Sequence, residues 1–173
     1  MNPSFTIPAD DLARKLVVAR PDDVSLAHVS VAGDTYTILV SGDETAGRYC
    51  LIDMVIPPGG GPPPHRHDFE EILVLSEGEL TFHFRGDQST IRAGSIVNIP
   101  ANAPHHFKNQ SAGHARMLCM DAPAGLDAFF LAVGDRVASR TSPPPALSPA
   151  EISERQARAK TLAAQFKTEL LIP

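Results

Sequence analysis

Short runs of apolar, β-branched and aromatic residues alternate with turn-forming residues through the middle of the chain. Each run has the length of a β-strand, and the segments between them are rich in Gly, Pro, Asp and Ser. Short strands separated by turns at this spacing are typical of an all-β sandwich or barrel. The strands that we expect are Tyr36–Val40, Arg48–Ile56, Glu71–Leu75, Glu79–Phe84, Ser95–Ile99, His105–Lys108 and Ala115–Met120.

The two ends of the chain have different patterns. A short helix is predicted at Asp10–Val18 and another at Leu126–Val133. Next comes a proline-rich connector, Ser142–Pro149, and the sequence Ser148-Pro149-Ala150-Glu151 is a capping box that predicts the start of a longer helix. That helix has one apolar stripe, so it should pack on its own barrel or on a neighbouring subunit. We therefore divide the chain into an N-terminal extension (1–28), a barrel (29–122) and a C-terminal helical tail (123–173).

Composition and charge exclude several classes of partner. The 173 residues are 43% hydrophobic, which is enough for the core of one domain. A net charge of -5 leaves no basic face for nucleic acid, and no apolar run is long enough to cross a membrane. Because Met1–Lys15 lacks the pattern of a signal peptide, we expect a cytoplasmic protein. Cys50 and Cys119 lie in apolar runs and are predicted to be buried free thiols.

One group of polar residues indicates metal chemistry. His65, His67 and Glu71 are separated by even numbers of residues, so one regular strand would direct all three to the same face. Glu70 would then point away. Two imidazoles and a carboxylate that converge in a buried place are costly unless a cation binds them. A divalent metal suits these nitrogen and oxygen ligands.

The spacing of these residues resembles the two motifs of the cupin superfamily. The first motif is matched by Gly59, His65, His67, Glu71 and Gly78, and the second by Gly94, Pro100, His105 and Asn109. One position differs, because Asn102 stands where the family has glycine; Asn tolerates a positive φ, so the turn should form. The flanking segments are similar to single-domain cupins related to bacterial quercetin 2,3-dioxygenases.

The resemblance implies a fold, a metal and a reaction. The fold would be a single cupin barrel, a double-stranded β-helix or jelly roll. One divalent transition metal (Fe, Mn, Ni, Zn or Cu) would be held by His65, His67, Glu71 and His105, and Glu71 would also accept a proton from the substrate. The function would be that of a metal-dependent dioxygenase acting on a small aromatic or enol substrate. Two alternatives stay open: an isomerase or lyase of small acids or sugars, and a non-catalytic cupin that binds a small ligand.

Other residues are expected to lie outside this site. His106 should point away from His105, while His28 and His114 lie in turn-rich segments and should be solvated. The run Ile72–Leu75 is apolar on both faces, so its outer face should be covered by the tail helix or by a second subunit. We expect the second subunit, and hence a homodimer.

Overall fold

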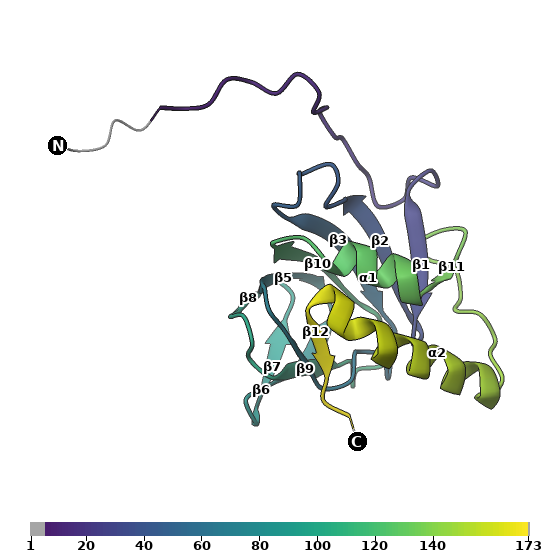
Figure 1. Ribbon diagram of the computed structural model, residues 1–173. Helices are drawn as coiled ribbons and strands as arrows, with labels where there is room; N and C mark the ends of the chain where they lie inside the picture. Colours follow the sequence, from purple (N-terminus) through teal and green to yellow (C-terminus); the bar gives the residue numbers. More distant parts are fainter. Residues whose placement is uncertain (1–5, 173) are drawn as a thin grey trace.

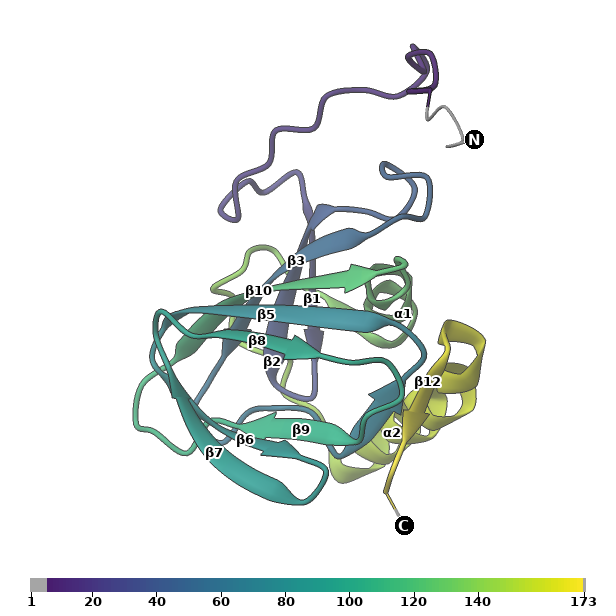
Figure 2. The ribbon, with the colours of Figure 1, turned by 90° about the vertical axis from the view of Figure 1, so that its left-hand side faces the viewer.

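Two antiparallel β-sheets face each other and form a barrel (Figures 1 and 2). The computed structural model describes residues 6–172, so residues 1–5 of the predicted extension and Pro173 lie outside the described part. The seven-stranded sheet has the order β11 (Asp135–Arg136), β1 (Ala27–Val31), β2 (Asp34–Val40), β3 (Cys50–Ile56), β10 (Ala115–Ala122), β5 (Glu70–Glu77), β8 (Ile96–Ile99). The five-stranded sheet has the order β12 (Thr168–Leu170), β4 (His65–His67), β9 (His105–Lys108), β6 (Glu79–Phe84), β7 (Asp87–Arg92).

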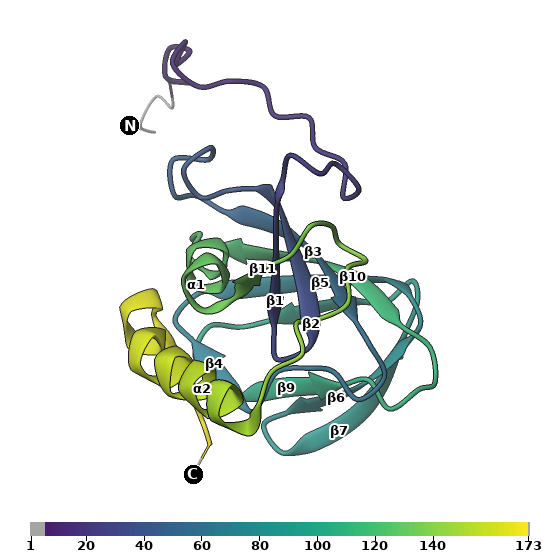
Figure 3. The same ribbon diagram turned by 90° about the vertical axis from the view of Figure 1, so that its right-hand side faces the viewer.

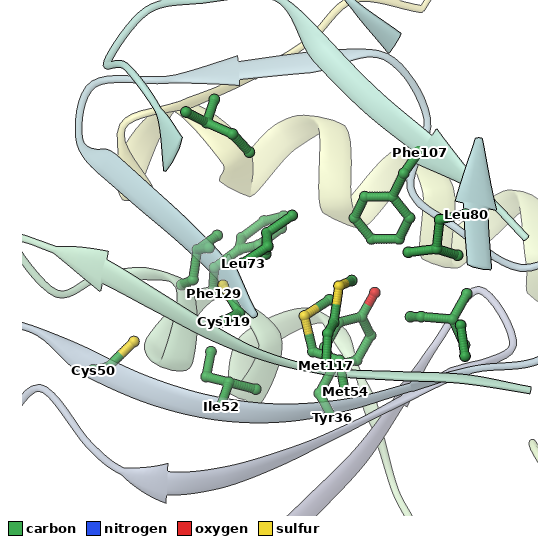
Figure 4. Close-up of a cluster of buried hydrophobic side chains, with 14 of the residues drawn as sticks. Tyr36, Cys50, Ile52, Met54, Leu73, Leu80, Phe107, Met117, Cys119 and Phe129 are labelled. Carbon is green, nitrogen blue, oxygen red and sulfur yellow. The ribbon is translucent and has the colours of Figure 1, made fainter. Parts of the chain in front are cut away.

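The core lies between the two sheets and follows the alternation of the strands. Along β10, each buried residue is followed by one that is partly exposed, as expected when one face of a strand is directed inward. Met117 and Cys119 of this strand meet Leu73 of β5 in the interior, and Leu80 and Phe107 approach from the five-stranded sheet (Figure 4). The predicted all-β barrel is therefore confirmed.

The strand β7 was missed by the sequence analysis because most of its side chains are polar and exposed. It forms because it continues directly from β6 through a tight turn at Arg85 and Gly86, whose φ angles are 51° and 96°. Two successive positive φ angles give the turn twist that suits an antiparallel hairpin. Pairing with β6 therefore decides the structure of this segment.

The C-terminal tail returns to its own barrel. Helix α1 (Leu126–Val133) matches its predicted bounds, and α2 (Pro149–Ala163) begins at Ser148 with the expected capping box. A 3₁₀ turn, η1 (Ala164–Phe166), follows α2, and the ring of Phe166 lies 5.6 Å from that of Phe129 in α1. The helix α2 thus packs on its own chain, beside α1 (Figure 3). Within residues 6–172, no helix combines the length and apolar character needed to span a bilayer.

The predicted helix at Asp10–Val18 is wrong. Only a turn forms there, in which the Asp11 carboxylate accepts a hydrogen bond from the backbone N–H of Ala13. Leu12, Leu16 and Val18 are almost fully exposed, and the segment extends away from the barrel (Figure 1). A short helix is unstable in water without tertiary packing, which this segment lacks.

Candidate metal centre

The histidines of the H-x-H sequence and Glu71 lie on two strands, not on one as predicted. His65 and His67 belong to β4 of the five-stranded sheet, whereas Glu71 belongs to β5 of the seven-stranded sheet. The chain crosses from one sheet to the other at residues 68–69. His105 lies on β9 directly opposite His65, so the second motif returns beside the first. The side chains therefore converge from two sheets. Their even spacing in the sequence does not explain why they meet, because Glu71 is not on the strand of His65 and His67.

One ligand-capable nitrogen from each of His65, His67 and His105 lies within 4.8 Å of the other two. The Oε2 atom of Glu71 lies 3.0 Å from Nε2 of His67 and 3.2 Å from Nε2 of His105. His67, Glu71 and His105 are 2%, 5% and 3% exposed, whereas His65 is only partly buried. The structure thus brings the four predicted residues together and leaves the side of His65 open to solvent.

Backbone carbonyl groups fix the orientation of all three imidazoles. The Nδ1 atoms of His65, His67 and His105 lie 2.8, 3.0 and 2.9 Å from the carbonyl oxygens of Pro63, Phe69 and Ala103. A carbonyl oxygen can only accept, so each Nδ1 carries the proton and each neutral ring has its lone pair on Nε2. For His67 and His105, that lone pair faces the Glu71 carboxylate.

The charge states of the site favour a cation. Burial raises the pKa of Glu71, but the hydrogen bonds and positive charge that His105 and His67 supply when Nε2 carries a proton outweigh this and hold that pKa well below its usual range. Burial and the nearby His105 lower the pKa of His65 to about 4. At neutral pH, Glu71 is therefore a carboxylate and His65 is neutral.

The donor set fits a divalent transition metal. With every Nδ1 protonated, His67 Nε2 and Glu71 Oε2 are two acceptors only 3.0 Å apart, an arrangement that requires a proton or a metal between them. In addition, no group within residues 6–172 forms a hydrogen bond with the buried Nε2 of His105. Neutral imidazoles and a carboxylate are the common ligands of such metals, and protein carbonyls on Nδ1 are their usual supports.

The remaining motif residues shape the loops around this centre. Asn102 has a φ of 67°, as the sequence predicts, and its N–H donates to the carbonyl oxygen of His67 at 2.7 Å. The Asn109 side chain donates to the carbonyl oxygen of Ile56 at 2.9 Å. Gly61 is not one of the matched motif positions, but a Cβ atom there would collide with the carbonyl oxygen of Phe107, so only glycine allows this loop to approach β9. The motif therefore specifies backbone contacts as well as ligands.

The other histidines lie outside the site. His106 stacks on His83 with ring centroids 4.2 Å apart, on the face of β9 opposite to His105, which confirms the prediction. His28 was expected to be solvated, and this is wrong: it is 2% exposed and its Nδ1 lies 2.8 Å from Oγ1 of Thr37. The reason is that His28 belongs to the strand β1, which begins at Ala27, and not to a turn.

Two features near the centre were missed by the sequence analysis. The thiol of Cys119 lies 3.1 Å from Oε1 of Glu71, although the sequence indicated only that it is buried. Strand β12 pairs with β4, so that Thr168 and Leu170 lie opposite His67 and His65. The position of Cys119 could have been found, because Cys119 is two residues from Met117 in a strand and therefore lies on the same inward face. The pairing of β12 with β4 had no such signal in the sequence, because β12 has only three residues.

Comparisons with known proteins agree with this geometry. Residues 52–121 match the family model of the Cupin domain. The chain is 27% identical over 101 residues to quercetin 2,3-dioxygenase of Bacillus subtilis, covering 58% of this chain and 30% of that protein. It is 31% identical over 71 residues to endoribonuclease YbeY of Myxococcus xanthus, covering 41% of this chain and 24% of that protein. The matches thus span less than a third of either relative.

A solved structure shows the same fold. The crystal structure of a predicted oxalate decarboxylase from Thermotoga maritima superposes with a TM-score of 0.56 at 21% identity, covering 61% of this chain and 98% of that one. Its likeness concerns the barrel, which here contains the three converging histidines. The protein therefore carries a cupin domain, and three of its histidines are placed to bind a metal.

Proposed function

We propose that this protein is a metal-dependent dioxygenase of the quercetinase type that acts on a small aromatic or enol substrate. The observation that carries the proposal is the position of Glu71, an ionised carboxylate beside the Nε2 atoms of His67 and His105. His65, His67, His105 and Glu71 would hold the metal, which would supply Lewis acidity and open coordination positions for substrate and O₂. Both atoms of O₂ would enter the organic product, so no external reductant is needed.

The residues of the chain define how a substrate would be handled. His65 is the partly exposed member of the set, so a substrate would approach from its side. The Phe69 ring stacks on that of His67 with centroids 4.0 Å apart, and this contact, together with the Phe69 carbonyl, keeps His67 in place. Glu71 would accept the proton of an enolic or phenolic hydroxyl group, because a carboxylate that binds a metal through one oxygen keeps a second oxygen as a base, whereas a fourth histidine would have its one lone pair on the metal.

The similarity to the Bacillus subtilis quercetin 2,3-dioxygenase supports this choice of reaction over the alternatives. Because the match covers 30% of that protein, the substrate class is part of the proposal. An isomerase or lyase would use the same residues without O₂, and a binding protein would use them without turnover.

Oxygen uptake separates these functions. The metal-free protein is loaded separately with Fe, Mn, Ni and Cu, and flavonols, catechols and small enol acids are offered under O₂. We expect at least one metal form to consume O₂ with one of these substrates. Glu71→Gln should retain some metal and lose turnover by about 10²-fold or more, the usual share of a general base. His106→Gln is the matched control and should keep full activity. Tight binding of these compounds with no O₂ uptake by any metal form would favour the isomerase or the binding protein.

We also propose that the protein is a homodimer that pairs through the outer face of the seven-stranded sheet. Val74 lies opposite Leu118 on one side and Ile96 on the other, and Ile72 lies opposite Met120. Val74 is 37% and Ile96 is 71% exposed. Helix α1 packs on β1, β3 and α2, and α2 packs on α1 and β12. Of the two covers that the sequence left open, these contacts favour the second subunit over the tail helix. Exposed apolar side chains that lie next to one another often mark a protein–protein contact.

The N-terminal segment gives a second reason for a partner copy. Its apolar side chains Ile7, Leu12, Leu16 and Val18 are almost fully exposed. At about 3.3 Å per extended residue, the segment is long enough to reach across a neighbouring barrel. Light scattering should therefore give twice the mass of the chain. Ile96→Lys should shift the protein to monomer, whereas Ile152→Lys, at an exposed apolar position on α2, should not. A monomeric wild type at micromolar concentration would contradict the proposal.

A further inference from the structure

We propose that Cys119 is a positioning residue for the metal centre: its thiol donates a hydrogen bond to Oε1 of Glu71 and thereby leaves Oε2 facing His67 and His105. This inference rests on the proposed metal site and concerns a residue outside the two sequence motifs. The distance between Sγ and Oε1 is 3.1 Å. Cys119 is fully buried and Glu71 is 5% exposed.

The two strands place this contact in register. β5 and β10 are antiparallel neighbours in which Leu73 lies opposite Cys119 and Glu71 lies opposite Asp121. Cys119 and Glu71 are therefore diagonal neighbours on the same inward face, close enough for their side chains to meet. Figure 4 shows Cys119 among the buried side chains, close to Leu73 and Phe129. The thiol thus lies at the boundary between the apolar core and the cluster of ligands.

The direction of the hydrogen bond follows from the chemistry of the two groups. The ionised Glu71 can only accept, so the proton must belong to sulfur. Cys119 is buried beside the apolar core, where a thiol keeps its proton at neutral pH. Among the described residues, Cys119 is the one donor to Oε1, whereas Oε2 faces both His67 and His105. Cys119 therefore distinguishes the two oxygens of the carboxylate.

Loss of this donor should change how the carboxylate meets a metal. A group that forms a hydrogen bond with a metal ligand fixes the orientation of that ligand. Removal of such a group typically weakens metal affinity by about 10- to 100-fold. Without the thiol, Oε1 would be a buried acceptor with no partner and would turn toward the metal side. Serine at this position would restore a donor in a smaller side chain.

The second cysteine provides a matched control. Cys50 is also buried, and its thiol also donates to a carboxylate, that of Asp121. Asp121 in turn accepts from the backbone N–H of Leu126 at the start of α1, so this pair supports the tail and not the ligands. A change at Cys50 therefore reports the general effect of losing a buried thiol next to a carboxylate.

The test compares Co²⁺ binding by the full-length wild type, Cys119→Ala, Cys119→Ser and Cys50→Ala. Affinity is measured by competition with a chelator, and the ligand geometry is followed by the visible d–d bands. We expect Cys119→Ala to bind Co²⁺ about 10- to 100-fold more weakly with altered bands. Cys119→Ser should return to near wild-type affinity and spectrum, and Cys50→Ala should match the wild type in both.

Three outcomes would overturn the inference. Equal affinity and identical bands for Cys119→Ala and the wild type would show that the thiol positions nothing. A strong near-ultraviolet sulfur-to-cobalt band in the wild type would make Cys119 a direct ligand. A wild type that binds no Co²⁺ would remove the metal site itself, and with it the proposed function. The first outcome leaves the proposed function intact, so the two failures can be told apart.

Discussion

The two sheets hold their parts of the metal centre in different ways. On the five-stranded sheet, each histidine is oriented by a carbonyl group only two residues away in the sequence. On the seven-stranded sheet, Glu71 is oriented by His105 and Cys119, which come from other strands. The histidines are therefore oriented by local backbone, whereas the carboxylate depends on the assembled barrel. The comparison shows that ligands of one site can have different structural origins.

The strands that carry these ligands also differ. β5 has eight residues and lies between β10 and β8, both of which pair with it closely. β4 has only three residues and lies between β9 and β12. Since β12 belongs to the C-terminal tail, the histidine strand depends on the far end of the chain for most of its pairing.

Removing a histidine should have the largest effect. His65→Ala, His67→Ala and His105→Ala should each lose tightly bound metal, because each deletes a nitrogen of the converging set. Metal content per chain after purification and dialysis measures this. His106→Ala is the control and should stay loaded, since its ring lies on the opposite face of β9. An empty His106→Ala beside a loaded His105→Ala would reverse the assignment.

Removing β12 should have the next largest effect. A chain that ends at Lys167 loses the strand that pairs with β4, so His65 and His67 lose support on one side. We expect metal affinity to fall by about tenfold or more, in the range seen for lost supporting contacts. Glu169→Ala is the control: it breaks only the exposed ion pair with Arg66, which typically contributes about 0–1 kcal/mol. Unchanged affinity in the shortened chain would show that β4 is held by β9 alone.

As the pH falls, His65 should be protonated before Glu71, and the protein should lose stability as a result. The pKa of His65 is about 4 in the folded, metal-free protein and near 6.5 when unfolded. Its contribution to stability is therefore complete above about pH 6.5 and is lost as the pH falls toward 4, to a total of about 3 kcal/mol. Glu71 stays ionised through this range because its pKa is well below the usual value.

Urea unfolding of the metal-free wild type and of His65→Gln between pH 4.5 and 7.5 measures this contribution. The wild type should lose more stability with falling pH than the variant, and parallel curves would contradict the prediction. The metal-loaded protein should in addition release its metal below about pH 6, because protons compete for the imidazoles. Its unfolding temperature should then approach that of the metal-free protein.

Much of the fold could be predicted because the signals were local. β6 and β9 have their predicted bounds, as does helix α1, since each combines a regular pattern with clear turn or capping residues at its ends. The strand β1, the polar strand β7 and the short strands β11 and β12 were not predicted. The structure of β7, β11 and β12 comes from pairing with β6, β1 and β4, and their own side chains carry little signal.

The sequence by itself determined which residues form the candidate site and how its histidines are turned. The motif spacing identified His65, His67, Glu71 and His105, and the carbonyl groups that orient the rings lie within two residues of each histidine. Only the tertiary structure decided that Glu71 arrives from the opposite sheet, that Cys119 supports it and that β12 supports β4. The physical reason is distance along the chain: contacts between strands far apart in sequence form only when the two sheets close on a common core.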